Sequence, residues 1–200
     1  VMLYWYLHEK KGWRGPVVRN LATTHMLDVM AASFGEVCYE VPVGFKYISS
    51  KIDEVDAVLG GESSGGLTVR GHIHGKDSVY AASLFVEMIS VVEKSPSEIM
   101  DALTAAYGTF RMVEDNITFT PEQKSYVDRV IFVEHRLPDF GKPVSRVSYE
   151  DGCKVYFADN SFVICRFSGT EPLLRIFAGA SDEAAARGFV TAFRRLLARE

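Results

Sequence analysis

The first hundred residues alternate helix-like and strand-like hydrophobic patterns, and this alternation predicts an α/β fold in which helices are layered on a sheet. Expected helices cover 1–11, 23–34, 44–52, 77–93 and 96–107, and expected strands cover 16–20, 36–41 and 56–60. Thr23 or Thr24 can cap the second helix, and Ser95 with a following proline can begin the fifth. A glycine-rich segment, 60–66, directly follows the third strand. It therefore falls at the carboxyl end of a strand, where open α/β sheets bind ligands.

The pattern changes after Gly108, which we interpret as a boundary between a domain at 1–107 and a domain at 108–200. A strand at 109–119 is followed by a helix after Thr120-Pro121, and the closing segment 182–199 is an amphipathic helix. Further strands are expected near Val144, Val155, Ile164 and Ile176. Asp151-Gly152 is a hairpin turn signal. The second domain is predicted to be an α+β unit with helices on one face of an antiparallel sheet.

Composition excludes several classes of partner. The chain has 200 residues, 48% of them hydrophobic, which is enough for packed cores, and its formal charge is −4. No run of Lys or Arg exceeds two residues, so we expect neither nucleic acid nor an anionic membrane as a partner. The apolar stretch 79–92 contains Ser83 and Glu87 and does not resemble a transmembrane span, and no secretory signal pattern is present.

Cysteine usage favours a cytoplasmic protein. Cys38, Cys153 and Cys165 are odd in number, widely separated, and lie in or beside expected strands. No CxxC pair or Cys/His cluster has the spacing of metal ligands. We expect reduced core thiols rather than disulfides or a zinc site.

The segment Arg166-Phe-Ser-Gly-Thr-Glu-Pro-Leu-Leu-Arg175 combines two guanidiniums, two hydroxyls and a glycine within ten residues. Arginine presents a planar fork of donors that matches phosphate oxygens, and Ser168 and Thr170 add hydroxyl donors. Gly169 allows the backbone to turn and offer its own N–H groups to an anion. The apolar flanks predict a strand, a tight loop and a strand. These residues fit a phosphate clamp, and they also fit an ordinary surface turn with two nearby arginines.

Four motifs of this chain resemble the α-D-phosphohexomutases, the phosphoglucomutase and phosphomannomutase family, and they occur in the family's order. Arg166 to Arg175 resembles the phosphate-binding loop of the family's last domain. Gly60-Gly-Glu-Ser-Ser-Gly-Gly66 is similar to its sugar-binding loop, and Val43-Gly-Phe-Lys-Tyr47 to its TPTGWK or TPVGFK segment. The segment His72 to Asp77 is similar to a stretch reading His-Ile-Pro-Glu-Lys-Asp.

The resemblance implies a fold and a place in a longer chain. Members have four domains, three on a shared α/β plan and a fourth on a TATA-binding-protein-like plan. This chain resembles the third, without a few starting residues, and the whole fourth. Domains 1 and 2 of the same polypeptide are therefore expected partners.

The resemblance also implies roles for individual residues. Glu62 and Ser64 fall at the sugar-contacting positions, where a carboxylate can accept from two neighbouring hydroxyls. Substrate-binding candidates from the other segments are Gly44, Lys46 and Lys76. Arg19 is a further candidate, because it is a basic residue at a strand end where family members often have Arg or Lys. His74 and Gly75 depart from the usual Pro-Glu, which puts the local loop shape in question. The phosphate-binding candidates are Arg166, Ser168, Gly169, Thr170 and Arg175.

The family's reaction moves a phosphoryl group between the 1- and 6-positions of a hexose. As implied by the resemblance, a phosphoserine in the first domain donates, a hexose 1,6-bisphosphate reorients, and Mg²⁺ is held in the second domain. This sequence contains no segment resembling the phosphoserine loop or the acidic metal loop. We therefore expect a substrate-recognition half without catalytic residues or metal ligands of its own, and negligible mutase activity from these residues alone.

Two alternatives remain open. The chain could be a noncatalytic sugar-phosphate-binding module, since both ligand loops are present. It could also belong to a phosphoglucosamine mutase, whose loops usually read Gly-Glu-Gln-Ser-Gly-His and Arg-Pro-Ser-Gly. Gly66 and Phe167 stand at the corresponding places here and favour glucose or mannose phosphates.

Overall fold

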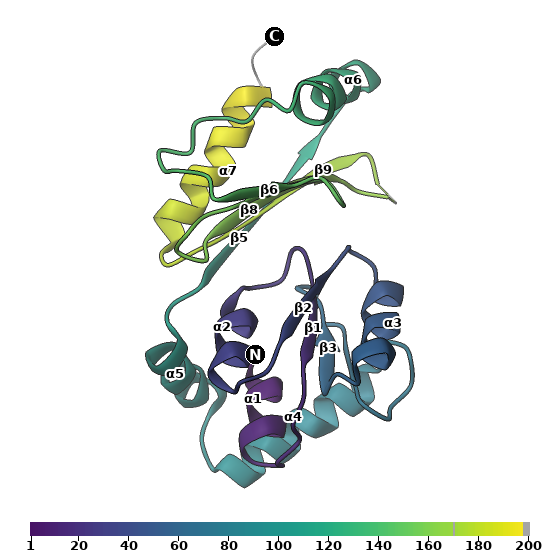
Figure 1. The fold of residues 1–200 in the computed structure, drawn as a ribbon, viewed down its shortest axis with the longest axis vertical. Helices are drawn as coiled ribbons and strands as arrows, with labels where there is room; N and C mark the ends of the chain where they lie inside the picture. The colour runs from purple at the N-terminus through teal and green to yellow at the C-terminus, as the bar shows by residue number, and fades with distance from the viewer. Residues whose placement is uncertain (170, 198–200) are drawn as a thin grey trace. The chain divides into compact units, whose positions relative to one another are not determined.

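A computed structural model describes residues 1–169 and 171–197. The chain forms two compact units, the first from Val1 to Thr109 and the second from Phe110 onward (Figure 1). The first unit is a layered α/β domain and the second is an antiparallel sheet with helices. Both halves of the predicted fold class are therefore confirmed. Within the described residues, no helix is long and apolar enough to cross a membrane.

The first unit has a four-stranded sheet in the order β2-β1-β3-β4. Strands β1, β2 and β3 are parallel, and β4 pairs antiparallel with β3. The elements of this unit are α1 (Met2–Glu9), β1 (Val17–Asn20), α2 (Met26–Ser33), β2 (Cys38–Val41), α3 (Phe45–Val55), β3 (Leu59–Gly61), β4 (Leu67–Val69), α4 (Ser78–Val92) and α5 (Pro96–Tyr107).

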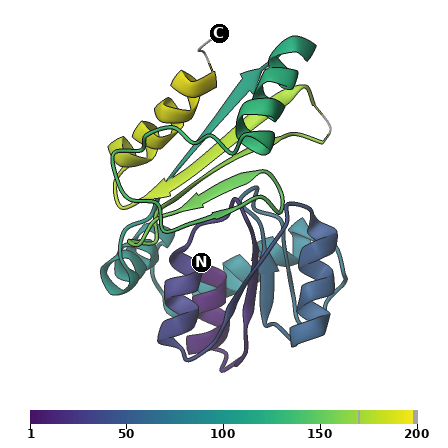
Figure 2. The same ribbon diagram turned by 45° about the horizontal axis from the view of Figure 1, so that its top comes forward.

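Helices cover both faces of this sheet. Successive residues of a strand point to opposite faces, so neighbouring residues belong to different cores. Val17 belongs to a core that α1, α2, α4 and α5 cover. Its neighbour Val18 belongs to a smaller core with Ile48 and Ile52 of α3. Figure 2 shows α3 on one side of the parallel strands and α1 and α2 on the other. The fully buried β1 is what a central parallel strand requires.

Capping residues explain several helix boundaries. Ser95 and Glu98 form a reciprocal capping box at the start of α5, as the sequence predicts. Helix α2 begins later than expected, at Met26, whose N–H donates to Thr24 Oγ1 at 3.3 Å. Strand β4 was not predicted; its three residues make the glycine-rich segment the loop of a β-hairpin.

The second unit has a five-stranded antiparallel sheet in the order β5-β9-β8-β7-β6. Its elements are β5 (Arg111–Thr118), α6 (Pro121–Val127), the π-helix η1 (Asp128–Val133), β6 (Arg146–Ser148), β7 (Cys153–Tyr156), β8 (Phe162–Phe167), β9 (Leu173–Ala180) and α7 (Glu183–Leu197). Helix α7 lies across one face of the sheet (Figure 1).

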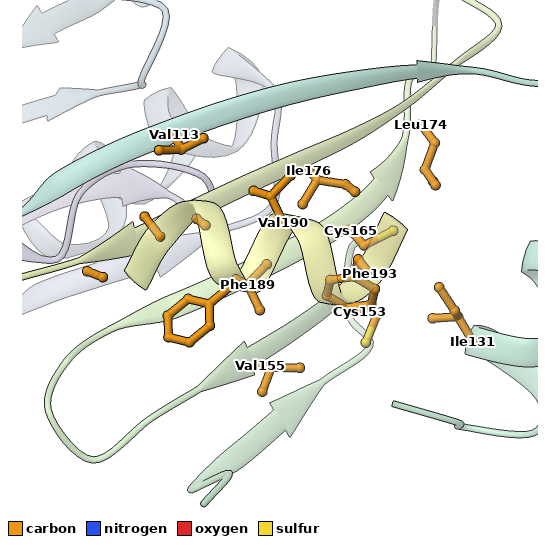
Figure 3. Packing of buried hydrophobic residues seen from close by; sticks show 14 of the residues in the cluster. Val113, Ile131, Cys153, Val155, Cys165, Leu174, Ile176, Phe189, Val190 and Phe193 are labelled. Atoms are coloured by element: carbon orange, nitrogen blue, oxygen red, sulfur yellow. The ribbon is translucent and has the colours of Figure 1, made fainter. Parts of the chain in front are cut away.

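The core of the second unit lies between this helix and the sheet. Phe189, Val190 and Phe193 of α7 pack with Cys165 and Ile176 of the strands (Figure 3). Alternate residues along β8 therefore have distinct environments, because Cys165 faces the helix and its neighbours face the other side. Arg166 is one of these neighbours. The sheet thus presents this arginine on the face that α7 does not cover.

Cysteines occur in or beside strands, as expected. Cys38, Cys153 and Cys165 are free thiols. Cys153 and Cys165 are direct partners across β7 and β8 and are both buried. Burial raises the pKa of Cys153 to about 11 and holds the pKa of Cys165 well above its usual value. These thiols are core residues with little thiolate character.

Candidate functional site

The loop between β3 and β4 holds the Glu62 carboxylate in a fixed position. Its hairpin is closed by two backbone bonds, Glu62 N–H to Gly66 O at 3.0 Å and Gly65 N–H to Glu62 O at 2.9 Å. The Glu62 side chain is only 7% exposed. Ser64 Oγ donates to Glu62 Oε1 at 2.9 Å. Glu62 and Ser64, predicted as a pair, therefore lie in direct contact.

Asn20 is a contributor that the sequence reasoning missed. It is the last residue of β1, and its side-chain Nδ2 donates to Glu62 Oε2 at 3.5 Å. Its Oδ1 accepts from the Thr23 hydroxyl at 2.8 Å and from the Ala22 N–H at 3.0 Å, which fixes the amide. The available signal was an asparagine at the carboxyl end of the expected strand 16–20.

Lys76 reaches across the hairpin to the same carboxylate. Its Nζ donates to Glu62 Oε1 at 2.6 Å, and its methylenes pass directly over Gly66. A Cβ at position 66 would lie 2.2 Å from Lys76 Cδ, so the glycine makes room for this crossing. Oε1 of Glu62 thus accepts from Lys76 and Ser64. Because an ionised carboxylate has about four acceptor sites, capacity remains for a ligand hydroxyl.

The segment before Lys76 is tied down despite its unusual sequence. The Thr68 hydroxyl donates to Ile73 O at 2.7 Å, and the Ser49 hydroxyl donates to His74 O at 3.2 Å. Asp77 then caps α4 by accepting from the Tyr80 and Val79 N–H groups. The bond from Tyr80 and the contact with His72 lower the pKa of Asp77. These anchors position Lys76 without the Pro-Glu found in similar sequences.

Gly44 and Lys46 stand at the beginning of α3, after β2. Gly44 precedes the helix at φ 137°, a conformation that favours glycine. Lys46 is exposed and its Nζ lies 4.8 Å from the Tyr47 ring centroid. Phe45 is the link to the hairpin, because its ring lies 5.6 Å from Lys76 Nζ. The start of α3 therefore contacts the hairpin through this aromatic ring.

Arg19 lies among acids rather than at the surface of the site. It is 2% exposed on β1 and donates from Nε and Nη2 to both oxygens of Asp28, at 2.7 and 2.8 Å. Its Nη1 donates to Glu40 at 2.6 Å. Burial alone would lower the Arg19 pKa, but the hydrogen bonds and charge of Asp28 outweigh it and raise the pKa. Its guanidinium therefore already joins α2 and β2 to β1.

In the second unit, Arg166 and Arg175 are direct partners across β8 and β9. Side chains at directly paired positions share one face of a sheet, so the two guanidiniums emerge together beside the loop 168–172. Like charges placed directly opposite each other destabilise a sheet unless anions neutralise them. The register therefore brings two positive charges together on one face of the sheet.

Each arginine has a carboxylate partner. Arg166 donates from Nη2 and Nε to Asp151 Oδ1, at 3.2 and 3.4 Å. Arg175 donates from Nη2 to Glu171, and its Nη1 lies 3.7 Å from Glu114. Three acids thus surround two cations.

The loop between the arginines is closed by backbone bonds. Ser168 N–H donates to Leu173 O and Leu173 N–H donates to Glu171 O, both at 2.8 Å. The Ser168 hydroxyl accepts from the Glu171 N–H at 3.3 Å. Gly169 is exposed, and its φ lies outside the left-handed region. Thr170, also predicted to bind phosphate, lies outside the described residues.

The structure therefore assembles two separate groups of predicted residues. Glu62, Ser64 and Lys76 form one group, and Arg166, Ser168 and Arg175 surround one loop. Among residues 1–169 and 171–197 there is no group of three or more His, Cys, Asp or Glu side chains arranged to hold a metal ion. The Mg²⁺ implied by the resemblance has no fitting donor set in this part of the chain.

Solved structures share this fold across nearly the whole chain. A protein of Thermus thermophilus, provisionally assigned as a phosphomannomutase, aligns with a TM-score of 0.76 and 26% identity, covering 98% of this chain and 39% of that one. A phosphoglucomutase/phosphomannomutase family protein from Burkholderia thailandensis aligns with a TM-score of 0.73 and 21% identity, covering 98% of this chain and 40% of that one. The fold is that of two consecutive domains of such enzymes.

Family models match both units. The model described as phosphoglucomutase/phosphomannomutase, alpha/beta/alpha domain III, matches residues 1–107, and that of the C-terminal domain matches residues 139–196. The chain belongs to the phosphoglucomutase/phosphomannomutase family. A phosphoglucomutase/phosphomannomutase of Thermococcus kodakarensis is 30% identical over 186 aligned residues, and the alignment covers 92% of this chain and 38% of that protein. A phosphoglucosamine mutase of Pseudomonas fluorescens is 25% identical over 96% of this chain and 39% of its own length. The chain thus spans about two fifths of these relatives.

Proposed function

We propose that this chain is the substrate-recognition part of a phosphohexomutase that interconverts hexose 1-phosphates and hexose 6-phosphates through a hexose 1,6-bisphosphate. The observation that carries the proposal is the direct pairing of Arg166 with Arg175, which puts two guanidiniums on one face of the sheet, as recognition of a dianion requires. The Glu62 carboxylate with its fixed donors supplies a complementary site for hydroxyl groups. A hexose phosphate carries both functions.

Each group has a physical role in this proposal. Glu62 accepts from neighbouring sugar hydroxyls, and Ser64 and Asn20 hold the carboxylate in place. Arg166, Arg175 and Ser168 bind the phosphate that is not reacting, together with Gly169 and Thr170. Phosphoryl transfer depends on positioning and charge stabilisation, so a fixed anchor contributes to rate as well as affinity. The phosphoryl donor and Mg²⁺ would be supplied by domains 1 and 2 in a cytoplasmic enzyme.

The remaining substrate-binding candidates differ in how directly they can contribute. Lys76 lies beside Glu62, where its ammonium can contact an anionic ligand. Gly44 and Lys46 belong to the neighbouring helix start. Arg19 donates to Asp28 and Glu40, so its contribution is to organise the carboxyl end of β1.

Binding by this chain tests the proposal. Titration calorimetry with glucose 1-phosphate should detect weak binding that Arg166→Ala and Arg175→Ala each reduce about tenfold, since each removes a charge-assisted bond to phosphate. Arg187→Ala is the matched control, because Arg187 lies on α7 and pairs with Glu183 of the same helix. Unchanged binding in both clamp variants would remove these residues from the site. The chain alone should not isomerise the sugar.

Hexose preference is proposed to be glucose or mannose rather than glucosamine. A side chain at position 66, such as the histidine of the phosphoglucosamine mutase pattern, would require Lys76 to move, because a Cβ there lies 2.2 Å from Lys76 Cδ. Gly66 and Lys76 are thus mutually compatible. A coupled assay of the full-length enzyme on each 1-phosphate should show slower turnover of glucosamine 1-phosphate.

A further inference from the structure

The carboxylates beside the two clamp arginines are held in different ways. Asp151 belongs to the turn between β6 and β7, on a different hairpin from Arg166. Glu171 belongs to the loop 168–172 itself, four residues from Arg175. Asp151 has a side chain 22% exposed, and Glu171 has one 52% exposed. This difference in attachment and exposure indicates different roles when phosphate binds.

The turn that carries Asp151 is packed directly against the Arg166 backbone. Gly152 follows at φ 91°, and a Cβ there would lie 2.6 Å from Cys165 O and 2.5 Å from Arg166 Cβ. Asp151 accepts on the Nε and Nη2 side of the guanidinium. Because the Arg166 side chain is only 15% exposed, this contact sets the direction of a largely buried cation.

Glu171 accepts from a terminal nitrogen of Arg175, Nη2. A phosphate bound by the fork of Arg175 needs its terminal nitrogens, because bidentate recognition uses parallel N–H donors. The carboxylate and an incoming phosphate would therefore compete for the same donor. A phosphate dianion carries more charge than a carboxylate, and Glu171 is exposed enough to move into solvent.

We propose that Asp151 is a positioning residue that orients the Arg166 guanidinium. We propose further that the Glu171 carboxylate pairs with Arg175 in the absence of ligand and is displaced by phosphate. This inference rests on the proposed phosphate site. Glu171 weakens phosphate binding and speeds release, because it neutralises Arg175 as the ligand leaves. Asp151 strengthens binding, because it holds the Arg166 fork in one orientation. The two acids thus act in opposite directions on one ligand.

Charge-removing variants separate these roles. Inorganic phosphate and glucose 1-phosphate are titrated into the parent chain and into Glu171→Gln, Asp151→Asn and Glu183→Gln. The last variant removes the same charge from a surface pair on α7 in the same unit and serves as the control. We expect Glu171→Gln to bind phosphate about three- to fivefold more tightly, the range for an exposed ion pair. We expect Asp151→Asn to bind about tenfold less tightly, and Glu183→Gln to stay within about twofold.

A gain of affinity cannot come from damage to the fold, which makes the Glu171 result decisive. For Asp151, the melting temperature of the variant is compared with that of the parent, and Asp151→Glu, which keeps the charge, should recover part of the affinity. Tighter binding by Asp151→Asn, or an unchanged affinity in Glu171→Gln, would overturn the inference while Arg175→Ala still weakens binding. If the Arg166→Ala and Arg175→Ala variants bind normally, the proposed function itself fails.

Discussion

The Glu62 hairpin and the loop 168–172 each pair a charged side chain with a more exposed counterion, and the signs of the two pairs are reversed. In the first, an acid with a 7% exposed side chain pairs with Lys76, which is 52% exposed. In the second, Arg175 is 30% exposed and pairs with Glu171, which is 52% exposed. In both, the less exposed member of an ion pair is proposed to contact the ligand. The more exposed member is its counterion.

The two counterions should nevertheless affect an anionic ligand in opposite ways. Lys76 has the charge that attracts a phosphate, whereas Glu171 has the charge that repels it. The anchoring also differs. Lys76 is held in place by the residue that follows it, Asp77, which caps α4. Glu171 lies within the loop 168–172, beside the Arg175 charge that it neutralises. The comparison therefore predicts which variants lose affinity and which gain it.

The largest expected effect concerns the stability of the Asp151-Gly152 turn, which packs against Arg166. Gly152→Ala should lower the free energy of unfolding of the second unit by about 3 kcal/mol, since it combines a left-handed backbone with a Cβ pressed against Cys165 O. Gly169→Ala is the control. Its Cβ would meet nothing within 4 Å, so it should change stability by less than about 1 kcal/mol. Urea unfolding of both variants measures the difference. Equal destabilisation would show that the Asp151-Gly152 turn does not constrain Arg166.

The next effect tests whether the Glu62 hairpin binds hydroxyls rather than phosphate. Glu62→Gln should weaken glucose 1-phosphate binding about tenfold, because a hydrogen bond to a charged acceptor is lost. Inorganic phosphate, which has no sugar hydroxyls, should bind the variant as it binds the parent. Calorimetry with the two ligands gives the comparison. A matched loss for both ligands would mean that Glu62 acts on the phosphate site instead.

A smaller expected effect on ligand binding distinguishes Lys76 from Lys46, the two lysines near the Glu62 hairpin. Lys76→Met should weaken glucose 1-phosphate binding about threefold through loss of an exposed cation beside Glu62. Lys46→Met removes an equal charge from a side chain that lies over Tyr47, and its effect should be smaller. Calorimetry on both variants measures the difference. Tighter binding by Lys76→Met would show that Lys76 competes with the sugar for Glu62, as Glu171 is proposed to compete with phosphate for Arg175.

The sequence identified both loops because their chemistry is local. Strand, turn and strand around Arg166 to Arg175 follow from apolar flanks and turn residues, and the structure has β8, the loop and β9 at these places. The direct register of the two arginines follows from their equal distance from the loop centre, yet the acid that neutralises Arg166 comes from another hairpin. Pairings of that kind depend on tertiary structure.

Arg19 shows more clearly which contacts could not be predicted from the sequence. Its position near the end of a strand indicated a ligand contact, but Asp28 and Glu40 converge on it from α2 and β2. No local pattern specifies that three charges separated by 9 and 21 residues will meet. Strand β4 was missed for a related reason, because its three residues carry too short an alternation to predict a strand.

The smallest expected effect concerns acid stability. Burial alone would raise the pKa of Asp159, but hydrogen bonds from Lys142 and Ser161 outweigh it and lower the pKa to about 2. The folded pKa is below the usual unfolded value of about 3.9, so the contribution is present above about pH 4 and is lost as the pH falls toward about 2. Because the Asp159 side chain is 51% exposed, solvent screening limits this to less than about 1 kcal/mol. Urea unfolding of the parent and of Asp159→Asn between about pH 5 and pH 2 should show a shallower acid dependence in the variant. Identical slopes would show that this turn, unlike the ligand loops, gains nothing from its ion pair.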